Sequence, residues 1–337
     1  MTGHVAVVTG GAGFIGSHAV DALLNRGYSV RVIDNLCGGS LANLEHLHGN
    51  PLLDFHETDI CTLPVDSSIF TGVDLILHFA GIGDIVPSVE RPLTYVETNV
   101  MGTIRVLEAA RNSGVSRLVY AASSSCYGSL PDIPTDESSP ISTEYPYALS
   151  KYLGEQAAFH WMKVYGLSVN SIRIFNAYGT RSRTSGAYGA GFGVFMRQKL
   201  AGAPFTVVGD GTQRRDFVFV TDVAEAFVRA GETKHSGQVW NLGGGAPESV
   251  NRLVELLGGP IVHLPKRPGE PEVTWADVKA IRRDLSWIPR VNFEEGVETV
   301  IANIDYWADA PLWDAASIAV ATEQWFRLLA VDLDGAK

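Results

Sequence analysis

The chain has 337 residues, 46% of them hydrophobic and 19% charged, and can bury a substantial core in one large domain or two lobes. Its formal net charge of −11 argues against nucleic acid and anionic membranes as partners, because both require a basic surface. Three cysteines (Cys37, Cys61 and Cys126) lack paired spacing, and no signal peptide or membrane span is predicted, so we expect a cytoplasmic protein without a metal site.

The first half of the chain alternates short apolar runs with helical patterns. A strand over His4 to Thr9 precedes a helix over Ile15 to Arg26, and Ser29 to Asp34 forms the next strand. Further strands are predicted over 53–59, 74–80, 117–122 and 169–175, and long helices over 92–113 and 147–166. This alternation predicts an α/β fold, a Rossmann-type doubly wound parallel sheet covered by helices on both faces.

After Asn176 the alternation becomes irregular, with a Gly- and Ser-rich stretch, short strands and scattered prolines. Two segments, Asp216 to Val220 and Val239 to Leu242, are predicted to return to the main domain. We therefore predict a dinucleotide-binding domain over residues 1–175 with returns near 216–242. A smaller interleaved α/β lobe over 176–215 and 243–337, including C-terminal helices, caps the carboxyl edge of the sheet.

A glycine pattern stands between the first strand and the first helix. Gly10, Gly13 and Gly16 allow a tight turn and close approach of a pyrophosphate to the helix N-terminus. Asp34 ends the second strand, where a carboxylate can accept bonds from ribose hydroxyls and would repel a 2′-phosphate, so NAD is favoured over NADP. Asp59 could meet the adenine amine or cap a turn.

A second motif could move a proton beside that dinucleotide. Tyr147 and Lys151 lie four residues apart, on one face of a predicted helix, and follow the serines Ser123, Ser124 and Ser125. The lysine ammonium and an oxidised nicotinamide would both favour the phenolate and lower the pKa of Tyr147 from its usual value of about 10. A serine hydroxyl can hold the substrate oxygen. The two motifs together indicate redox chemistry at an alcohol carbon.

From Val5 to about Val300 the chain resembles the nucleotide-sugar epimerase/dehydratase group of extended short-chain dehydrogenases/reductases, and most of all its UDP-glucose 4-epimerases. The resemblance rests on 9–16, 34–36, 78–81, 99–103, 123–128, 147–151, 173–176, 209–217 and 267–277, in that order. It implies that Tyr147 is the base, that Lys151 binds the nicotinamide ribose, and that Ser123, or its neighbour Ser124, is the catalytic hydroxyl.

The same resemblance implies the rest of the site. The cofactor would contact Gly10, Gly13, Phe14, Ile15, Gly16, Asp34, Asn35, Asp59, Ile60, Phe79, Ala80, Gly81, Asn99, Tyr147 and Lys151. The substrate, a nucleotide sugar and most simply a UDP-sugar, would contact Asn176, Arg215, Arg267 and Thr274. Bidentate guanidinium groups suit its phosphates. Thr274 occupies the position that lines the sugar pocket at C2, where a small residue would admit an acetamido group; it could equally pack as a strand residue.

Three functions remain open. The resemblance implies that dehydratases and decarboxylases place an acid directly after the catalytic hydroxyl, where this chain has Ser124 and Ser125. C4 epimerisation through a 4-keto sugar is therefore favoured over a 4,6-dehydratase or decarboxylase. The third alternative, a non-catalytic NAD-binding regulator, would have no use for a matched tyrosine and lysine. The resemblance also implies a homodimer that pairs the helices over 92–113 and 147–166.

Overall fold

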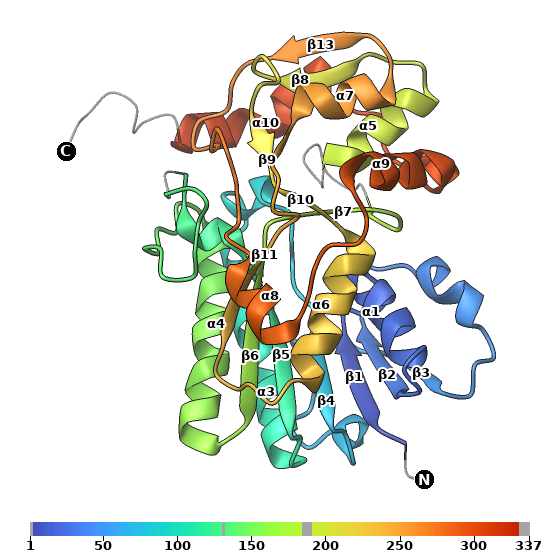
Figure 1. The fold of residues 1–337 in the computed structure, drawn as a ribbon, viewed down its shortest axis with the longest axis vertical. Coiled ribbons are helices and arrows are strands. Elements are labelled where there is room, and N and C mark those ends of the chain that lie inside the picture. Colours follow the sequence, from blue (N-terminus) through green and yellow to red (C-terminus); the bar gives the residue numbers. More distant parts are fainter. Residues whose placement is uncertain (1–2, 130–131, 184–190, 330–337) are drawn as a thin grey trace.

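The computed structural model describes residues 3–129, 132–183 and 191–329. A seven-stranded parallel sheet lies at its centre in the order β11-β6-β5-β4-β1-β2-β3 (Figure 1). Its strands are β1 (Val5–Thr9), β2 (Ser29–Asp34), β3 (Leu53–Glu57), β4 (Leu75–His78), β5 (Arg117–Ser123), β6 (Ser168–Ile174) and β11 (Val239–Leu242). Strands with both faces covered can be apolar throughout, and Ala6, Val7 and Val8 of β1 are fully buried. The predicted Rossmann-type fold is confirmed.

Helices cover both faces of this sheet. On one face lie α1 (Phe14–Leu24), α6 (Val220–Glu232) and α8 (Lys279–Leu285), which share a core with the sheet. On the other lie α3 (Thr103–Asn112) and α4 (Pro146–Tyr165). The helix predicted over 92–113 is interrupted, because α2 (Pro92–Val96) runs into a π-helical segment, η4 (Glu97–Gly102), before α3 begins.

The strand order places a crevice at one edge of the sheet. From β1 the chain builds β2 and β3 on one side, then crosses to build β4, β5 and β6 on the other. The connections on the two sides of this switch point diverge, so the carboxyl ends of β1 and β4 border an opening, where ligands of such sheets bind.

The smaller lobe sits beyond this carboxyl edge (Figure 1). It contains three two-stranded sheets, which pair β7 (Asn176–Tyr178) with β10 (Phe217–Phe219), β8 (Phe205–Val208) with β13 (Ile261–Leu264), and β9 (Arg214–Arg215) with β12 (Glu248–Ser249). Its helices are α5 (Gly191–Leu200), α7 (Val250–Leu257), α9 (Phe293–Ala302) and α10 (Ala315–Leu329). A separate apolar core joins β7, β8, β10, α5, α7 and α9.

Within the predicted return at Asp216 to Val220, β10 pairs with β7 outside the central sheet, and β11 then joins that sheet beside β6. The assignment of this segment to the main domain stays a prediction. One expectation needs correction. The third strand ends at Glu57, and Asp59 lies in the following turn.

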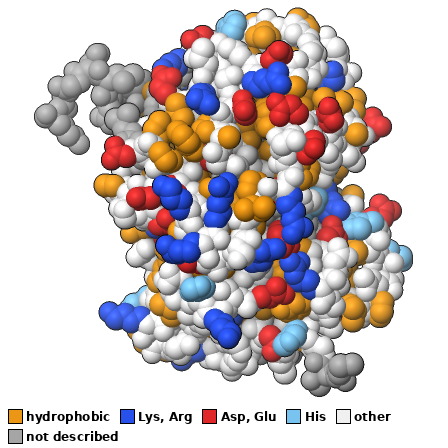
Figure 2. Space-filling model, viewed as in Figure 1, with side chains coloured by type: hydrophobic (Ala, Val, Ile, Leu, Met, Phe, Trp, Pro, Cys, Tyr) orange, Lys and Arg blue, Asp and Glu red, His pale blue; other side chains and the backbone are white. Residues whose placement is uncertain are grey.

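The glycine-rich stretch Thr184 to Gly191 falls almost wholly outside the described residues. Within the described part of the chain, no helix is long and apolar enough to cross a membrane. Figure 2 shows acidic and basic side chains interspersed over one face of the molecule. The division into two domains at the predicted boundaries stays a prediction.

Candidate active site

A cavity of about 730 Å³ opens at the carboxyl ends of β1, β2 and β4. Most residues predicted from the sequence line it: Gly10, Gly13, Phe14, Ile15, Gly16, Asp34, Asn35, Asp59, Ile60, Phe79, Ala80, Gly81, Ser123, Tyr147 and Lys151. The lining does not include Asn99 or Ser124, nor the four residues predicted for the substrate. Gly16 and Tyr147, 131 residues apart in sequence, thus line one cavity at the carboxyl edge of the sheet.

The turn after β1 requires glycine. Gly10 has a φ of +70° and lies against the backbone of Ala80, and a Cβ at Gly16 would stand 2.1 Å from the carbonyl oxygen of Gly10. A Cβ at Gly13 would stand 3.1 Å from the same oxygen. The N-terminus of α1 is therefore bare backbone facing the cavity, which is the arrangement that a pyrophosphate needs.

Asp34 is held at the end of β2 by two backbone groups. Its Oδ2 accepts from the amide of Ala12 at 3.0 Å and its Oδ1 from the amide of Leu36 at 2.8 Å. Burial raises the pKa of Asp34, and these two hydrogen bonds act against the rise. Leu36 itself is left-handed at φ 60°, which turns the chain away and leaves the carboxylate at the cavity wall. The group can accept ribose hydroxyls and would repel a phosphate.

Ser123, Tyr147 and Lys151 meet opposite the glycine turn. The Ser123 side chain, at the end of β5, lies close enough to the Tyr147 hydroxyl to lower its pKa. Lys151, one turn further along α4, is 8% exposed, and its ammonium lies 4.7 Å from the centre of the Tyr120 ring. Ser124 follows in the short helix η5 (Ser124–Tyr127), so of the two serine candidates only Ser123 lines the cavity.

Burial is the main influence on the pKa values of Lys151 and Tyr147. It lowers the pKa of Lys151 to about 8, with the Glu155 carboxylate acting in the opposite direction. It also raises the pKa of Tyr147, although the nearby Ser123 side chain lowers it. The expectation that Lys151 and an oxidised nicotinamide together depress the pKa of Tyr147 stays a prediction. A further positive charge beside the ring is needed to favour the phenolate.

Asn99 does not line the cavity, but its side chain holds in place the loop that does. Its Oδ1 accepts from the amide of Ile82 at 2.7 Å, and its Nδ2 donates to the carbonyl of Ile82 and to the Ser150 hydroxyl. The side chain is 1% exposed. Asn99 thus ties the loop after β4 to α4 and fixes Gly81 near Lys151.

The residues predicted for the substrate form two pairs in the smaller lobe. The Thr274 hydroxyl donates to Oδ1 of Asn176 at 2.7 Å. Arg215 and Arg267 share one carboxylate, since Glu270 lies 2.7 Å from Nη2 of Arg215 and 3.9 Å from Nη1 of Arg267. Two guanidinium groups on one small anion make a site that a diphosphate could occupy.

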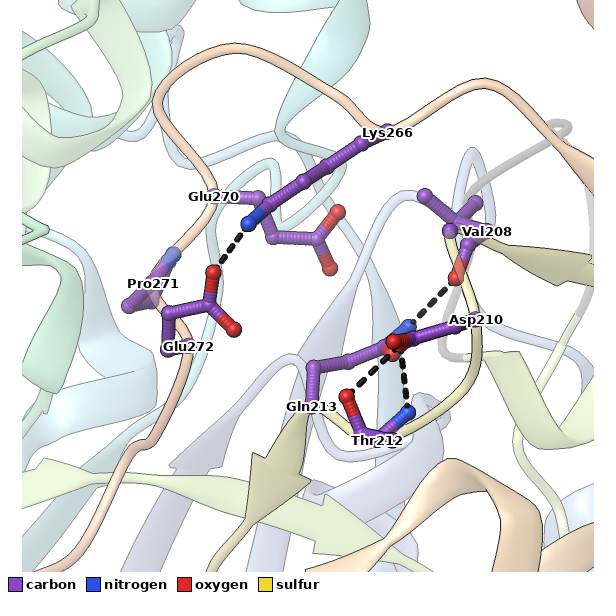
Figure 3. A pocket seen from close by; sticks show the side chains of 9 residues that line it. Val208, Asp210, Thr212, Gln213, Lys266, Glu270, Pro271 and Glu272 are labelled. Atoms are coloured by element: carbon purple, nitrogen blue, oxygen red, sulfur yellow. Dashed lines mark hydrogen bonds and ion pairs between the residues drawn. The ribbon is translucent and has the colours of Figure 1, made fainter.

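A second cavity, of about 340 Å³, is lined in part by Glu270, the shared partner of the two arginines (Figure 3). One wall is the β8–β9 connection, where Gln213 donates to the carbonyl of Val208 and Thr212 donates to Asp210. The facing wall carries Lys266, paired with Glu272, together with Glu270 and Pro271. The walls offer amide, hydroxyl and backbone groups rather than a continuous apolar surface.

Sequence reasoning missed about half of the large cavity. The unpredicted lining comprises Ile33, Cys37, Gly38, Gly39, Thr58, Ile82, Gly83, Asp84, Thr94, Thr98, Ala121, Ala122, Ile174, Phe175, Ala177, Ser182 and Arg183. Many of these residues end a strand or follow one directly, and that position is a signal that could have found them. Ser182 and Arg183 come from the smaller lobe and had no such signal.

A Rossmann-type sheet with this cavity is typical of enzymes that move a hydride and a proton beside a bound dinucleotide. A family model described as "NAD dependent epimerase/dehydratase family" matches residues 6–243. The chain belongs to this family. It is an NAD-dependent enzyme, and the bare glycine turn and the carboxylate of Asp34 fit that cofactor.

Individual relatives agree with the family. A putative UDP-glucose 4-epimerase of Methanocaldococcus jannaschii is 35% identical over 303 residues, which are 88% of this chain and 96% of the relative. The structure of UDP-N-acetylglucosamine 4-epimerase from Methanobrevibacter ruminantium has a TM-score of 0.83 at 30% identity, covering 90% and 100% of the two chains. A dTDP-glucose 4,6-dehydratase from Streptomyces venezuelae with NAD bound has a TM-score of 0.82 at 30% identity, covering 91% and 97%. Epimerases and dehydratases therefore resemble this chain to a similar degree.

Proposed function

We propose that this protein is a nucleotide-sugar C4 epimerase that acts through a transient 4-keto sugar, with a UDP-sugar as substrate. The observation that carries the proposal is that Ser123, Tyr147 and Lys151 line one cavity together with the glycine turn, with serines at the two positions after Ser123. Elimination of water requires an acid close to the reacting carbon, and Ser124 and Ser125 cannot supply one.

The position of each residue in or next to the cavity determines the role that we assign to it. NAD supplies the hydride acceptor and donor when it is bound. Tyr147 takes the proton of the C4 hydroxyl and later returns it, while Ser123 holds the same oxygen. Lys151 binds the ribose and, as a buried cation, opposes the burial that keeps the phenol protonated. Asn99 keeps the Gly81 loop against the site.

The smaller lobe binds the rest of the substrate. Arg215 and Arg267 hold the diphosphate in place of the Glu270 carboxylate that they now share. The nucleoside then extends into the 340 Å³ cavity next to them (Figure 3). Asn176 is joined to Thr274, and its chain neighbours Phe175 and Ala177 both line the large cavity.

Thr274 favours tolerance of a large group at C2 of the sugar. Its side chain is small and half-buried and is turned toward Asn176. A bulky residue at this place would exclude an acetamido group by steric clash, which discriminates more strongly than a weakened contact. We expect UDP-sugars with a 2-acetamido group to be accepted, and Thr274→Tyr to suppress them more than their 2-hydroxy analogues. Equal loss of both substrates would show that Thr274 does not control C2.

The alternative is a 4,6-dehydratase, which the NAD-bound relative from Streptomyces venezuelae supports. Incubation with UDP-, dTDP-, GDP- and CDP-sugars, read by mass spectrometry and by NMR of the anomeric protons, separates the two. An epimerase changes the NMR spectrum without changing mass, whereas a dehydratase or a decarboxylase lowers the mass. If denaturation releases NAD but no sugar nucleotide is turned over, the third alternative, a non-catalytic NAD-binding regulator, is the function that remains.

A homodimer is part of the proposal. Leu93 on α2 is 81% exposed, Met101 is 49% exposed, and Leu149 and Leu153 on α4 are about 40% exposed. The segments that carry them pack side by side on one face of the sheet, so a second copy would cover them as a four-helix interface. The cytoplasmic location stays a prediction.

A further inference from the structure

The C-terminal helix α10 (Ala315–Leu329) lies outside the matched family region, and its sequence gave no functional signal. The structure anchors it firmly. The segment before it is held by α5, where Arg197 donates to the carbonyl of Ala310 and the buried Gln198 donates to that of Trp313. Ile318, Thr322 and Trp325 form the buried face of α10. Its C-terminal end lies above the segment that enters α4 (Figure 1).

Trp325 connects two parts of the proposed site. Its indole ring centre lies 5.4 Å from that of Tyr145, the residue that precedes α4. Its Nε1 donates to the carbonyl of Pro268 at 3.1 Å, and Pro268 directly follows Arg267. The indole is 5% exposed. One side chain therefore touches the large sheet domain through Tyr145 and the smaller lobe through Pro268.

Each of the two residues that Trp325 contacts lies next to a group of the proposed site. The Tyr145 ring stacks beside the Tyr147 ring at 6.4 Å with an 8° interplanar angle, and the Ser125 side chain hydrogen-bonds its hydroxyl. On the other side, the chain from Pro268 leads to Glu270, the shared partner of the two arginines. The position of Trp325 thus affects both the base and the diphosphate site.

We propose that Trp325 is a positioning residue that sets the distance between the Tyr147 base and the Arg215–Arg267 diphosphate site. The inference rests on the proposed function, because it assumes that one substrate spans both groups. The distance that a nucleotide sugar can span from its diphosphate to C4 is limited by a few bonds, so a shift between the lobes misplaces C4 even when the diphosphate is bound. Reactivity depends steeply on such placement.

Two substitutions separate the two contacts. Trp325→Phe retains a ring against Tyr145 but removes the hydrogen bond to Pro268, one of the two links between the sites. KM for the UDP-sugar should rise about fivefold, the usual worth of one hydrogen bond, and kcat should fall, by a smaller factor than in Trp325→Ala. Trp325→Ala removes both contacts and should lower kcat/KM about 10²-fold, with a fall in kcat as well as a rise in KM. Neither variant should lose NAD, which is measured by its release on denaturation.

Trp287→Phe is the matched control. Its indole is also buried and also donates to a backbone carbonyl, that of Asp222, but it lies under α6, away from the site. Thermal unfolding reports whether the variants fold. Kinetic constants of Trp325→Phe and Trp325→Ala that match those of Trp287→Phe would overturn the inference. Wild-type protein that turns over no nucleotide sugar would instead overturn the proposed function.

Discussion

A buried ion pair next to the active site makes the sharpest prediction of stability. Glu155 lies one turn after Lys151 on α4 and accepts from Nη2 of Arg173 at 2.7 Å and from Nε at 3.1 Å. The two side chains are 1% and 7% exposed. Arg173 also donates to the Tyr127 hydroxyl, so the pair joins α4, β6 and the turn after β5. Glu155→Leu would leave a guanidinium buried without its carboxylate.

The cost follows from this burial. Removing one partner of a buried pair costs about 3–5 kcal/mol, because the remaining charge is left desolvated. For a chain of this size, the corresponding fall in Tm is on the order of 5–10 °C. Arg173→Met should cost a similar amount. The double variant should cost less than the sum of the two, because it buries no charge. Urea unfolding and calorimetry measure all three variants.

A solvated pair in the same protein provides the control. Arg252 and Glu255 lie 2.8 Å apart with side chains 36% and 69% exposed, so Arg252→Met should cost less than about 1 kcal/mol. If Glu155→Leu and Arg173→Met cost no more than Arg252→Met, the reasoning from burial is wrong. Strictly additive losses in the double variant would also contradict it, since the two charges would then act independently.

The remaining predictions concern the cofactor, the base and the assembly. Gly16→Ala should fold but release NAD, because its Cβ would stand 2.1 Å from a backbone oxygen; co-purified NAD at the wild-type level would refute this. Asp34→Ala should narrow the preference for NAD over NADP, measured by the nucleotides released on denaturation, and an unchanged ratio would remove its assigned role. Tyr147→Phe should retain NAD while turnover falls about 10²–10⁴-fold; activity near wild type would exclude it as the base. Charge introduced by Leu149→Glu with Leu153→Glu should yield a monomer in sedimentation, whereas a wild-type protein that is already monomeric at micromolar concentration would contradict the dimer.

Much of the large cavity was predictable because its residues follow sequence rules. Strand ends can be read from apolar runs, and a parallel sheet brings those ends to one edge, so Gly10, Asp34 and Ala80 could be placed together. Tyr147 and Lys151 follow from helical spacing. The sequence left both Ser123 and Ser124 open as the catalytic hydroxyl, and of the two only Ser123 lines the cavity.

What could not be predicted depends on packing between segments far apart in sequence. No spacing rule shows that Glu270 lies between Arg215 and Arg267, or that the Thr274 hydroxyl turns toward Asn176. The rise in the pKa of Tyr147 is a result of burial, which depends on the whole fold. In the sequence, Trp325 is only one of several apolar residues in a helical pattern. Its contacts with Tyr145 and Pro268, which the fold alone creates, set it apart from the others.

The π-helical segment η4 limits how this region of the chain can change length. Asn99 lies inside this wide turn and accepts from the Thr103 hydroxyl through its backbone carbonyl, while its side chain holds Ile82 and Ser150. Deleting one residue from Glu97 to Gly102 would restore a regular helix and turn everything on one side of it by about 100°. Either Asn99 would leave the loop after β4, or α3 would present its polar face to the sheet. Surface loops of the same chain can gain or lose residues at little cost, but here the number of residues is itself a structural constraint.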